Sequence, residues 1–456
     1  MLTDPALAEL RVLFGARASV AAAVLAAHGQ SESLITAGLA DAVVFPRSTD
    51  EVAALATWST RHLVPLIGWG AGTSLEGHAL ALTGGVTVDF RDMAAVLEVQ
   101  AEDRLVRVQP GITREALNLE LRATGLMFPV DPGANASLGG MASTRASGTT
   151  AVRYGTMRDN VRGLVVVLAD GRVIRTGTGA PKSASGYDLT ALFVGAEGTL
   201  GLITELTLRL SAQPEAVMTA VAGFPGIAEA VDCVMATMQM GLAPARIELL
   251  DAQTVAACNA FSGLNLPLTP QLLVEFHGHP EGLAEDIRRF RDLAAEFGAA
   301  DLQWAERTED RTRLWAARHA AYRAILASRP GSKAVVTDVC VPISQLAGAI
   351  AATRADIAAS GLPGPILGHV GDGNFHAILL VDPAVPAEAA TAKALGVRMA
   401  ERALQLGGTI TGEHGVGFGK LTMMEAEHGA AWAVMGTLKR ALDPLGLMNP
   451  GKLVPS

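Results

Sequence analysis

The chain has 456 residues, of which 50% are hydrophobic and 18% are charged, so it can build more than one packed core and is not predominantly disordered. The formal net charge is −9 and the sequence has no basic run, which argues against nucleic acid as a partner. The longest apolar stretches, such as 21–27, are shorter than the roughly 18 residues of a transmembrane helix. Helices are predicted within 1–40, where Leu7, Leu10 and Phe14 recur at helical spacing.

From Ala42 to residue 212, short β-rich runs separated by turns predict an α+β domain built around sheets. After Pro214, strand-like runs alternate with segments that predict helices over 226–240, 282–297, 311–326 and 344–360. This alternation predicts an open sheet with helices on one face. Further helices are predicted around 387–406 and 431–442, on either side of a glycine-rich loop.

An alternating glycine loop follows a predicted strand in the first domain. Gly68, Gly70 and Gly72 let the backbone curl so that successive N–H groups face an anion, and Thr73 and Ser74 add hydroxyl donors. The spacing matches neither the dinucleotide fingerprint GxGxxG nor a P-loop. We interpret the loop as a pyrophosphate site of another fold, with a tight strand-to-helix turn as the alternative.

Three more glycine-rich segments, 131–148, 154–174 and 186–204, lie in the same domain. Backbone without bulky side chains can lie flat against a large planar ligand. Each segment alone is also compatible with a chain of turns. Their density beside the phosphate loop favours a buried flavin dinucleotide.

A histidine pair flanks a predicted hairpin turn in the second domain. Asp372-Gly373 is a typical two-residue type I′ turn, and it would place His369 opposite His376 on one face of the sheet. Two imidazoles so placed can bind one divalent cation. The alternative is a pair of sheet histidines that hydrogen-bond to other groups.

Glu413 offers a third, oxygen ligand from the loop TGEHGVGFGK. Two histidines and one carboxylate leave positions on the metal open for a substrate, and they suit zinc, manganese or iron. His414 is next to Glu413 and need not be a ligand. The alternative is a solvated polar turn.

Six motifs stand in one order along the chain, namely GTSLEG (72–77), GGMASTRASG (139–148), GAEGTLGLIT (195–204), GHVGDGNFH (368–376), GEHGVG (412–417) and LMNPGK (447–452). With them the chain resembles the FAD-linked oxidoreductases of the vanillyl-alcohol-oxidase and para-cresol-methylhydroxylase superfamily, specifically their 2-hydroxy-acid dehydrogenase branch. Within that branch it is most similar to the D-lactate dehydrogenase (cytochrome) type.

The resemblance implies an α+β fold with a two-part FAD-binding domain of the PCMH type and a cap domain. The N-terminal helices would span 1–40 and the FAD-binding domain 41–213. A substrate or cap domain, with an antiparallel sheet, helices and the metal site, would span 214–425. The segment 426–456 would return to the FAD-binding domain.

The resemblance also implies roles for single residues. The positions matching His369, His376 and Glu413 hold a divalent metal in the family, and the one matching His414 is the catalytic base. Arg318, in an LWxxR motif, matches the arginine that binds the substrate carboxylate, which we expect to be a bidentate clamp. The residues expected to hold FAD are Gly68, Gly70, Ala71, Gly72, Thr73, Ser74, Pro132, Gly139, Gly140, Ser143, Gly148, Gly155, Glu197, Gly198, Gly201, Ile203 and Asn449.

Two further residues are candidates for substrate contacts. Lys333 can bind an anion or be an ordinary surface charge, and Asn374 can contact substrate or only favour the turn. His78 follows the phosphate loop and is a candidate tether, because some superfamily members attach FAD covalently. We expect noncovalent FAD.

We hypothesise that a 2-hydroxy acid binds the metal, that His414 removes its hydroxyl proton, and that hydride passes from the carbinol carbon to FAD. Where 2-hydroxyglutarate dehydrogenases of this family hold a second carboxylate with polar residues, this chain has Tyr322, Val336 and Ile378. Burying a second carboxylate there is costly. We therefore expect a D-2-hydroxy monocarboxylate, such as D-lactate.

The sequence leaves several alternatives open. The chain can instead be the flavoprotein subunit of a glycolate-oxidase-like complex, a D-2-hydroxyglutarate dehydrogenase, a non-redox transferase or a metal-free oxidase of the same fold. Electrons must leave to a separate acceptor, namely a cytochrome, a quinone or an electron-transfer flavoprotein. Three scattered cysteines and the lack of a secretory signal predict a cytoplasmic protein, with peripheral binding to the inner membrane and a homodimer left open.

Overall fold

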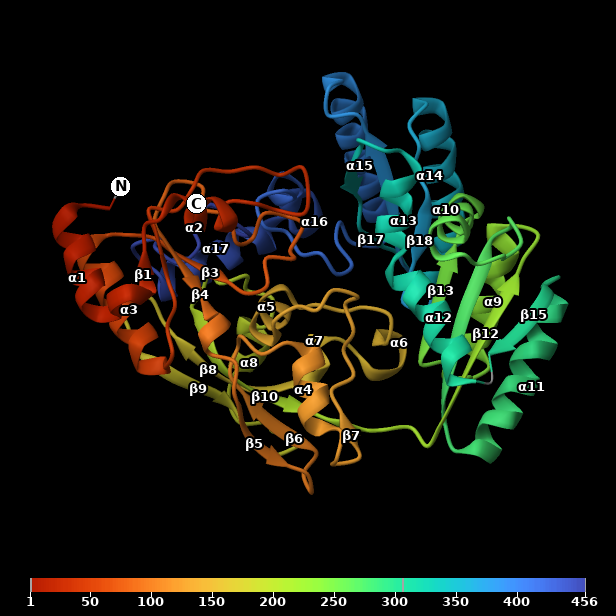
Figure 1. Ribbon diagram of the computed structural model, residues 1–456, viewed down its shortest axis with the longest axis horizontal. Helices are drawn as coiled ribbons and strands as arrows, with labels where there is room; N and C mark the ends of the chain where they lie inside the picture. The colour runs from red at the N-terminus through yellow and green to blue at the C-terminus, as the bar shows by residue number, and fades with distance from the viewer. Residues whose placement is uncertain (1, 306, 456) are drawn as a thin grey trace. The chain divides into compact units, whose positions relative to one another are not determined.

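Figure 1 shows the computed structural model, which describes residues 2–305 and 307–455. The chain divides into two compact units, each assembled from separate segments. The first unit holds the residues up to Ser147, Gly155–Gln213 and the residues from Glu413 onward, and the second holds Gly148–Tyr154 and Pro214–Gly412. None of the described helices is both long enough and apolar enough to cross a membrane.

The first unit is built on two sheets. The smaller sheet has the order β1 (Ala18–Ser19), β2 (Ala42–Val44), β4 (Val86–Asp89), β3 (Leu66–Trp69), in which β2, β4 and β3 are parallel. The larger, antiparallel sheet has the order β5 (Val96–Gln100), β6 (Leu105–Val108), β10 (Leu202–Arg209), β8 (Val161–Val167), β9 (Val173–Gly177), and β7 (Leu126–Met127) pairs with β11 (Ser211–Ala212). The four-stranded and the five-stranded sheet are consistent with the two-part FAD-binding domain that the resemblance implies.

Helices α1 (Asp4–Phe14) and α3 (Thr49–His62) pack against the smaller sheet of this unit. Thr3 and Ser48 cap them with side-chain oxygens, and Leu10 and Phe14 are buried in one apolar cluster with Val44 and Val88 of the sheet. The N-terminal residues therefore share the core of this unit. Its other helices are α2 (Ala22–His28), α4 (Arg114–Leu121), α5 (Leu138–Thr144), α7 (Met157–Asn160), α8 (Leu189–Phe193), α16 (Met424–His428) and α17 (Ala430–Leu442).

The second unit is built on one antiparallel sheet, as the fold class predicts. Its strand order is β15 (Ala300–Ala305), β12 (Ala216–Gly223), β14 (Gln271–Gly278), β13 (Arg246–Leu250), β18 (Ile366–Gly368), β19 (Asn374–Val381), β16 (Lys333–Val336), and β17 (Val339–Cys340) also pairs with β19. The helices are α6 (Ala151–Tyr154), α9 (Ile227–Gln239), α10 (Ala252–Ser262), α11 (Pro280–Glu296), α12 (Thr308–His319), α13 (Ala321–Ser328), α14 (Leu346–Ser360) and α15 (Pro386–Gln405).

Helices cover both faces of this sheet, so the prediction that they lie on one face is wrong. Leu273 of β14 packs in a cluster with Val255 of α10 and Ile325 of α13. Phe276 of the same strand packs edge-to-face against Phe290 of α11, with ring centroids 5.7 Å apart. Positions 273 and 276 point to opposite faces because strand side chains alternate. An apolar run that is buried on both sides has no clear alternation, and this is why the second layer was missed.

The hairpin that carries the histidines has a longer turn than the sequence predicts. A two-residue turn would pair His369 with His376, but the observed register pairs Leu367 with His376. The carbonyl oxygen of His369 accepts hydrogen bonds from the backbone N–H of both Asp372 and Asn374, which makes residues 370–373 the turn. The register shift is two residues. Because the side-chain period of a strand is also two, both histidines still point to one face.

The helix predicted over 311–326 is two helices. α12 ends at His319 and α13 begins at Ala321, with Ala320 between them. Arg318 therefore lies in the last turn of α12, whereas Ala321 belongs to the next helix. Leu314 and Ala321 still pack at one apolar cluster, Ala321 within it and Leu314 against it.

Candidate active site

The histidine pair is the centre of the candidate site in the second unit. His369 and His376 are both buried, and their ring centroids are 5.6 Å apart. Nδ1 of His376 donates to the carbonyl oxygen of Thr337 at 3.1 Å and lies 3.7 Å from the Asp338 carboxylate. A proton held on Nδ1 leaves the lone pair of the neutral ring on Nε2, which is the atom a metal would bind.

Glu248 of β13 holds the other histidine. Its Oε1 accepts a hydrogen bond from Nδ1 of His369 at 2.6 Å, and its Oε2 accepts from Nη2 and Nε of Arg318 at 2.6 and 3.0 Å. Burial raises the pKa of Glu248, but the charges of His369 and Arg318 and their hydrogen bonds lower it more, so this pKa lies below its usual range. The carboxylate therefore stays charged at neutral pH.

The hydrogen bonds from Arg318 to Glu248 change how Arg318 can bind a substrate carboxylate. Arg318 is 8% exposed, and its Nε–Nη2 edge already faces a carboxylate of the protein. The protons of Nη1 and the second proton of Nη2 remain to hold a substrate carboxylate from the end of the guanidinium group. An end-on bidentate pair is compatible with this arrangement, whereas a side-on pair is not.

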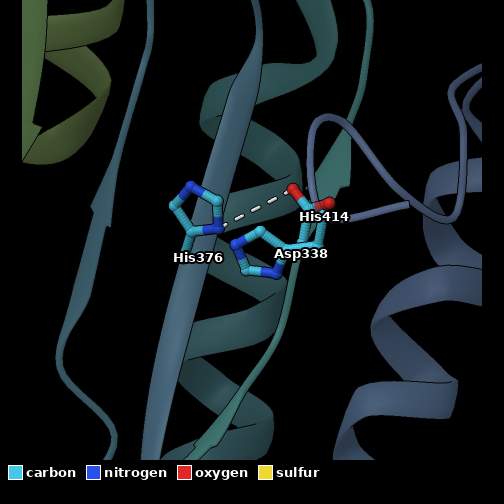
Figure 2. A group of neighbouring side chains, drawn as sticks. All are labelled: Asp338, His376 and His414. Atoms are coloured by element: carbon cyan, nitrogen blue, oxygen red, sulfur yellow. Dashed lines mark ion pairs between the residues drawn. The ribbon is translucent and has the colours of Figure 1, made fainter. Parts of the chain in front are cut away.

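Glu413 and His414 follow Gly412, the last residue of the second unit, directly in the chain. One ligand atom each of His369, His376 and Glu413 lie within 4.8 Å of one another, and the same is true of Asp338, His376 and His414. Figure 2 shows the second group, with the ion pair between His376 and Asp338 drawn. Nitrogen and carboxylate ligands this close together can bind a divalent cation.

The two other substrate candidates lie in different places. The side-chain amide of Asn374 donates to Asp338 Oδ1 at 2.7 Å and to the Val339 carbonyl at 2.9 Å. A Cβ on Gly412 would lie 2.1 Å from this amide nitrogen, so glycine is required there. Lys333 is exposed and pairs with Val381, which is about 17 Å along β19 from His376 at 3.4 Å per residue. The structure does not bring Lys333 to the histidines.

The positions that distinguish the 2-hydroxyglutarate branch are apolar in this structure. Val336 and Ile378 are directly opposite each other on β16 and β19. Ile378 belongs to a buried apolar cluster, and the partly buried Val336 and Tyr322 pack against it. None of these three side chains offers a cation to a second carboxylate.

The glycine loop of the first unit begins in β3 and packs closely against α5. A Cβ on Gly70 would lie 2.1 Å from Ser137 Oγ, at the residue before α5, and Gly72 has φ +74°. Only glycine fits both positions without displacement. Gly139, Gly140 and Ser143, all of α5, therefore lie on the element that contacts the predicted phosphate loop.

Glu197 joins distant segments of the first unit. Its φ is +53°, and its two carboxylate oxygens accept the backbone N–H groups of Val416 and Gly417, both at 2.8 Å. Nε2 of His78 lies 3.2 Å from Oε1. Burial raises the pKa of Glu197, but the charge and hydrogen bond of His78 and the two N–H groups lower it more, to below its usual range.

Asn449 and Lys452 complete this buried cluster. The Asn449 amide donates to the carbonyl oxygens of Glu197 at 2.6 Å and His78 at 3.0 Å. The Lys452 ammonium donates to Asn449 Oδ1 at 2.6 Å and to the carbonyl oxygens of His78 and Leu80 at 2.8 and 2.5 Å. The motifs that contain Glu197 and Asn449 are thus brought together with the residues after His414.

The remaining residues expected at FAD lie on segments of both units. Ile203 is in β10, and Gly201 is the residue directly before this strand. Gly198, Gly155 and Gly148 have positive φ. Ala71 is exposed in the glycine loop, Pro132 is partly buried, and Gly148 belongs to the second unit.

The first unit fits a bound FAD on two observations. His78 Nδ1 is buried without a hydrogen-bond partner among the described residues, which is a costly state that a ligand would relieve. Arg145, Glu197 and Asn449 all have positive φ, and strained backbone of this kind concentrates at ligand sites. These three residues lie in motifs that also contain residues predicted to hold FAD, whereas Leu63, Arg104 and Leu453 have positive φ outside those motifs.

The sequence analysis did not assign Glu248 or Asp338 to a site. It also did not predict that His78 lies beside Glu197. Glu248 stands inside the apolar run ARIELL, and Asp338 inside VVTDVCV. A carboxylate within a buried strand requires a partner, and this was the available signal. The partner itself could not be identified because His369 is 121 residues from Glu248.

The comparisons with known proteins agree with this architecture. Residues 40–177 match the FAD binding domain family, and residues 213–453 match the family of FAD linked oxidases, C-terminal domain. A solved structure of p-cresol methylhydroxylase with substrate bound has a TM-score of 0.81 at 18% identity, covering 98% of this chain and 96% of that one. The PCMH-type fold is confirmed.

Three relatives span most of this chain. A probable mitochondrial D-lactate dehydrogenase of Danio rerio is 50% identical, covering 96% of this chain and 88% of that protein. The mitochondrial D-lactate dehydrogenase [cytochrome] of Arabidopsis thaliana is 44% identical, covering 94% and 76%. The glycolate oxidase subunit GlcD of Bacillus subtilis is 35% identical, covering 91% and 88%. The chain therefore belongs to the family of FAD-linked oxidases and is a flavin-dependent oxidoreductase.

Proposed function

We propose that this chain is an FAD- and divalent-metal-dependent dehydrogenase that oxidises a D-2-hydroxy acid, D-lactate or a similar monocarboxylate, to the 2-oxo acid. The names of two relatives, both D-lactate dehydrogenases, support the substrate class. The observation that carries the metal is the set of His369, His376 and Glu413, whose ligand atoms lie within 4.8 Å of one another. When bound, FAD accepts the hydride of the substrate.

The residues of this chain supply binding, orientation and proton transfer. Arg318 binds the substrate carboxylate through the end of its guanidinium group. A divalent cation held by His369, His376 and Glu413 would lower the pKa of the substrate hydroxyl. His414 takes the hydroxyl proton, because imidazole is a suitable base near neutral pH. Val336 and Ile378 disfavour a second carboxylate on the substrate.

Electrons leave to a separate acceptor, namely a cytochrome, a quinone or an electron-transfer flavoprotein. The word cytochrome in the name of the Arabidopsis thaliana relative supports the first of these. We propose noncovalent FAD, which denaturation tests: yellow colour that stays with the precipitated protein would contradict it.

The purified protein tests the proposal by elemental analysis together with a substrate panel under dye reduction. We expect about one zinc, manganese or iron per chain and a higher kcat/KM for D-lactate than for D-2-hydroxyglutarate or L-lactate. Equal specificity constants for D-lactate and D-2-hydroxyglutarate would contradict the substrate class. A metal-free active enzyme would contradict the metal site.

The second candidate is the flavoprotein subunit of a glycolate-oxidase-like complex. The similarity to the GlcD subunit of Bacillus subtilis favours it. In that case the isolated chain would reduce dye slowly with every acid of the panel, and partner subunits would restore turnover with glycolate. Rapid turnover of D-lactate by the isolated chain would exclude it.

A further inference from the structure

Glu248 is the most deeply buried charged group near the histidine pair. It is 0% exposed in the middle of β13, and it contacts His369 through one carboxylate oxygen and Arg318 through the other. The sheet fixes this geometry, because Leu249 of β13 pairs with Gly368 of β18 and so brings position 248 beside position 369. One carboxylate thus holds a proposed metal ligand and the proposed substrate arginine together.

We propose that Glu248 is a positioning residue that fixes His369 with its proton on Nδ1 and its lone pair on Nε2, ready to bind the cation. The inference rests on the proposed function, because it assumes that His369 is a metal ligand. A carboxylate can only accept a hydrogen bond, so a neutral imidazole beside it must carry its proton on the facing nitrogen. Partners of this kind orient metal-binding histidines and raise their basicity.

The hydrogen bonds from Arg318 to Glu248 further constrain which ring nitrogen of His369 carries the proton. The Nη2 and Nε groups of Arg318 both donate hydrogen bonds to Oε2 of Glu248, so Oε2 must be an acceptor. If Glu248 became glutamine, the amide oxygen would face Arg318 and the amide NH₂ group would face His369. The NH₂ group would then donate to Nδ1, and the ring proton would move to Nε2. The nearly isosteric Glu248→Gln variant therefore blocks the metal-binding nitrogen, which a mere loss of packing would not do.

The neighbouring strand provides a matched control. Glu275 of β14 is also buried, accepts a hydrogen bond from Nε2 of His277 at 2.8 Å and one from Thr219 at 2.9 Å, and lies beside Arg246. It is a carboxylate paired with a histidine and an arginine in the same sheet, but it contacts neither His369 nor His376 in the described structure. Glu275→Gln tests the general cost of neutralising such a group.

The experiment titrates Zn²⁺ into chelator-treated flavoprotein, in competition with a chromophoric chelator, for wild type, Glu248→Gln and Glu275→Gln. FAD absorbance reports that each variant retains the cofactor. We expect the zinc affinity of Glu248→Gln to fall about 10–100-fold, and that of Glu275→Gln to stay within about threefold of wild type. Equal zinc affinity of Glu248→Gln and wild type would overturn the inference and leave the proposed function standing. A wild type that binds no zinc, manganese or iron would overturn both.

A second measurement does not depend on the folding of a variant. In metal-free wild type labelled with ¹⁵N-histidine, at a pH where the rings are neutral, nitrogen shifts distinguish the two tautomers of each ring. The His369 signal is identified by its loss in His369→Asn. We expect the Nδ1-protonated tautomer, and an Nε2-protonated ring would overturn the inference.

Discussion

His414 follows Glu413 in a glycine-rich loop and has a ligand atom within 4.8 Å of those of Asp338 and His376. If it takes the hydroxyl proton, His414→Ala will slow flavin reduction by D-lactate about 10²–10⁴-fold, the usual contribution of a general base. FAD and metal content will stay near wild type, since other residues are proposed to hold both. Stopped-flow absorbance of the flavin measures the rate. His428→Ala, in α16 of the same unit, is the control, and an unchanged rate in His414→Ala would remove this residue from the mechanism.

Glu197 allows a prediction of how stability depends on pH. Its pKa in the folded protein lies below the ordinary 4.5, so its stabilising effect is complete above that value and is lost as the pH falls through the folded pKa. Glutamine offers one acceptor oxygen where Val416 and Gly417 present two N–H groups. Glu197→Gln should therefore cost about 3 kcal/mol of unfolding free energy at neutral pH, and less below pH 4.5.

Thermal unfolding midpoints between pH 3.5 and pH 8 measure this difference. Glu205→Gln is the matched control, because Glu205 is a β10 carboxylate whose ion pairs with Arg107 and Arg175 are 3.9 Å long. It should lower the midpoint little at any pH. A difference between wild type and Glu197→Gln that persists unchanged at pH 3.5 would show that the charge of Glu197 is not responsible.

At the residue scale, sequence reasoning found the side chains that occur in compact motifs and missed those that connect motifs. His369, His376 and Glu413 are recognisable because each stands in a short, glycine-flanked run. Glu248 has no such surroundings, and its partner Arg318 is 70 residues away. Long-range pairs of this kind depend on strand order, which local periodicity does not contain.

At the scale of the element, the histidine hairpin shows which errors in a prediction are harmless. The predicted turn was wrong and the register was shifted by two residues, yet His369 and His376 still share a face because the shift is even. A register shift by an odd number of residues would have pointed one of the two imidazole rings to the opposite face of the sheet. The face of the candidate site was therefore predictable from the alternation of β19, although the turn was not.

Gly373 closes this hairpin and allows a prediction about the element. It has φ +79°, and a Cβ there would lie 2.0 Å from the carbonyl oxygen of Val341, so Gly373→Ala must displace the turn. Gly361 at the end of α14 has a similar φ of +74° but nothing within 4 Å, which makes Gly361→Ala the control for backbone strain alone. We expect Gly361→Ala to cost about 1 kcal/mol of unfolding free energy and Gly373→Ala at least twice as much.

Urea unfolding and zinc titration check this prediction together. Displacing the turn moves the start of β19, which carries His376, so Gly373→Ala should also weaken zinc binding, whereas Gly361→Ala should not. Equal unfolding free energies for the two variants would mean that the hairpin tolerates a side chain at 373 and that the turn is not held as tightly as the structure indicates.

At the scale of the whole molecule, the residues proposed to hold FAD and the metal come from both units, and Glu413 of the proposed metal set belongs to the first. The glycine loop, Glu197 and Asn449 lie in the first unit, and the histidine pair lies in the second. Each unit is assembled from segments that are far apart in the chain, so no single stretch of sequence could have predicted this division. A ligand stabilises the structure that binds it by RT ln(1 + [L]/Kd), about 2.7 kcal/mol at 100 times Kd.

Hydrogen exchange tests whether that stabilisation is confined to one unit. Two samples are compared, both with FAD bound, one loaded with Zn²⁺ and one treated with chelator. If the units open independently, zinc will slow exchange by up to about 100-fold in β13, β18 and β19, and it will leave β3, β4 and α1 unchanged. His369→Ala should abolish the zinc effect in all peptides. Because Glu413 belongs to the first unit, protection of the peptide that contains it does not decide the question. Equal protection of β3, β4 and α1 by zinc would show that the units open as one cooperative body.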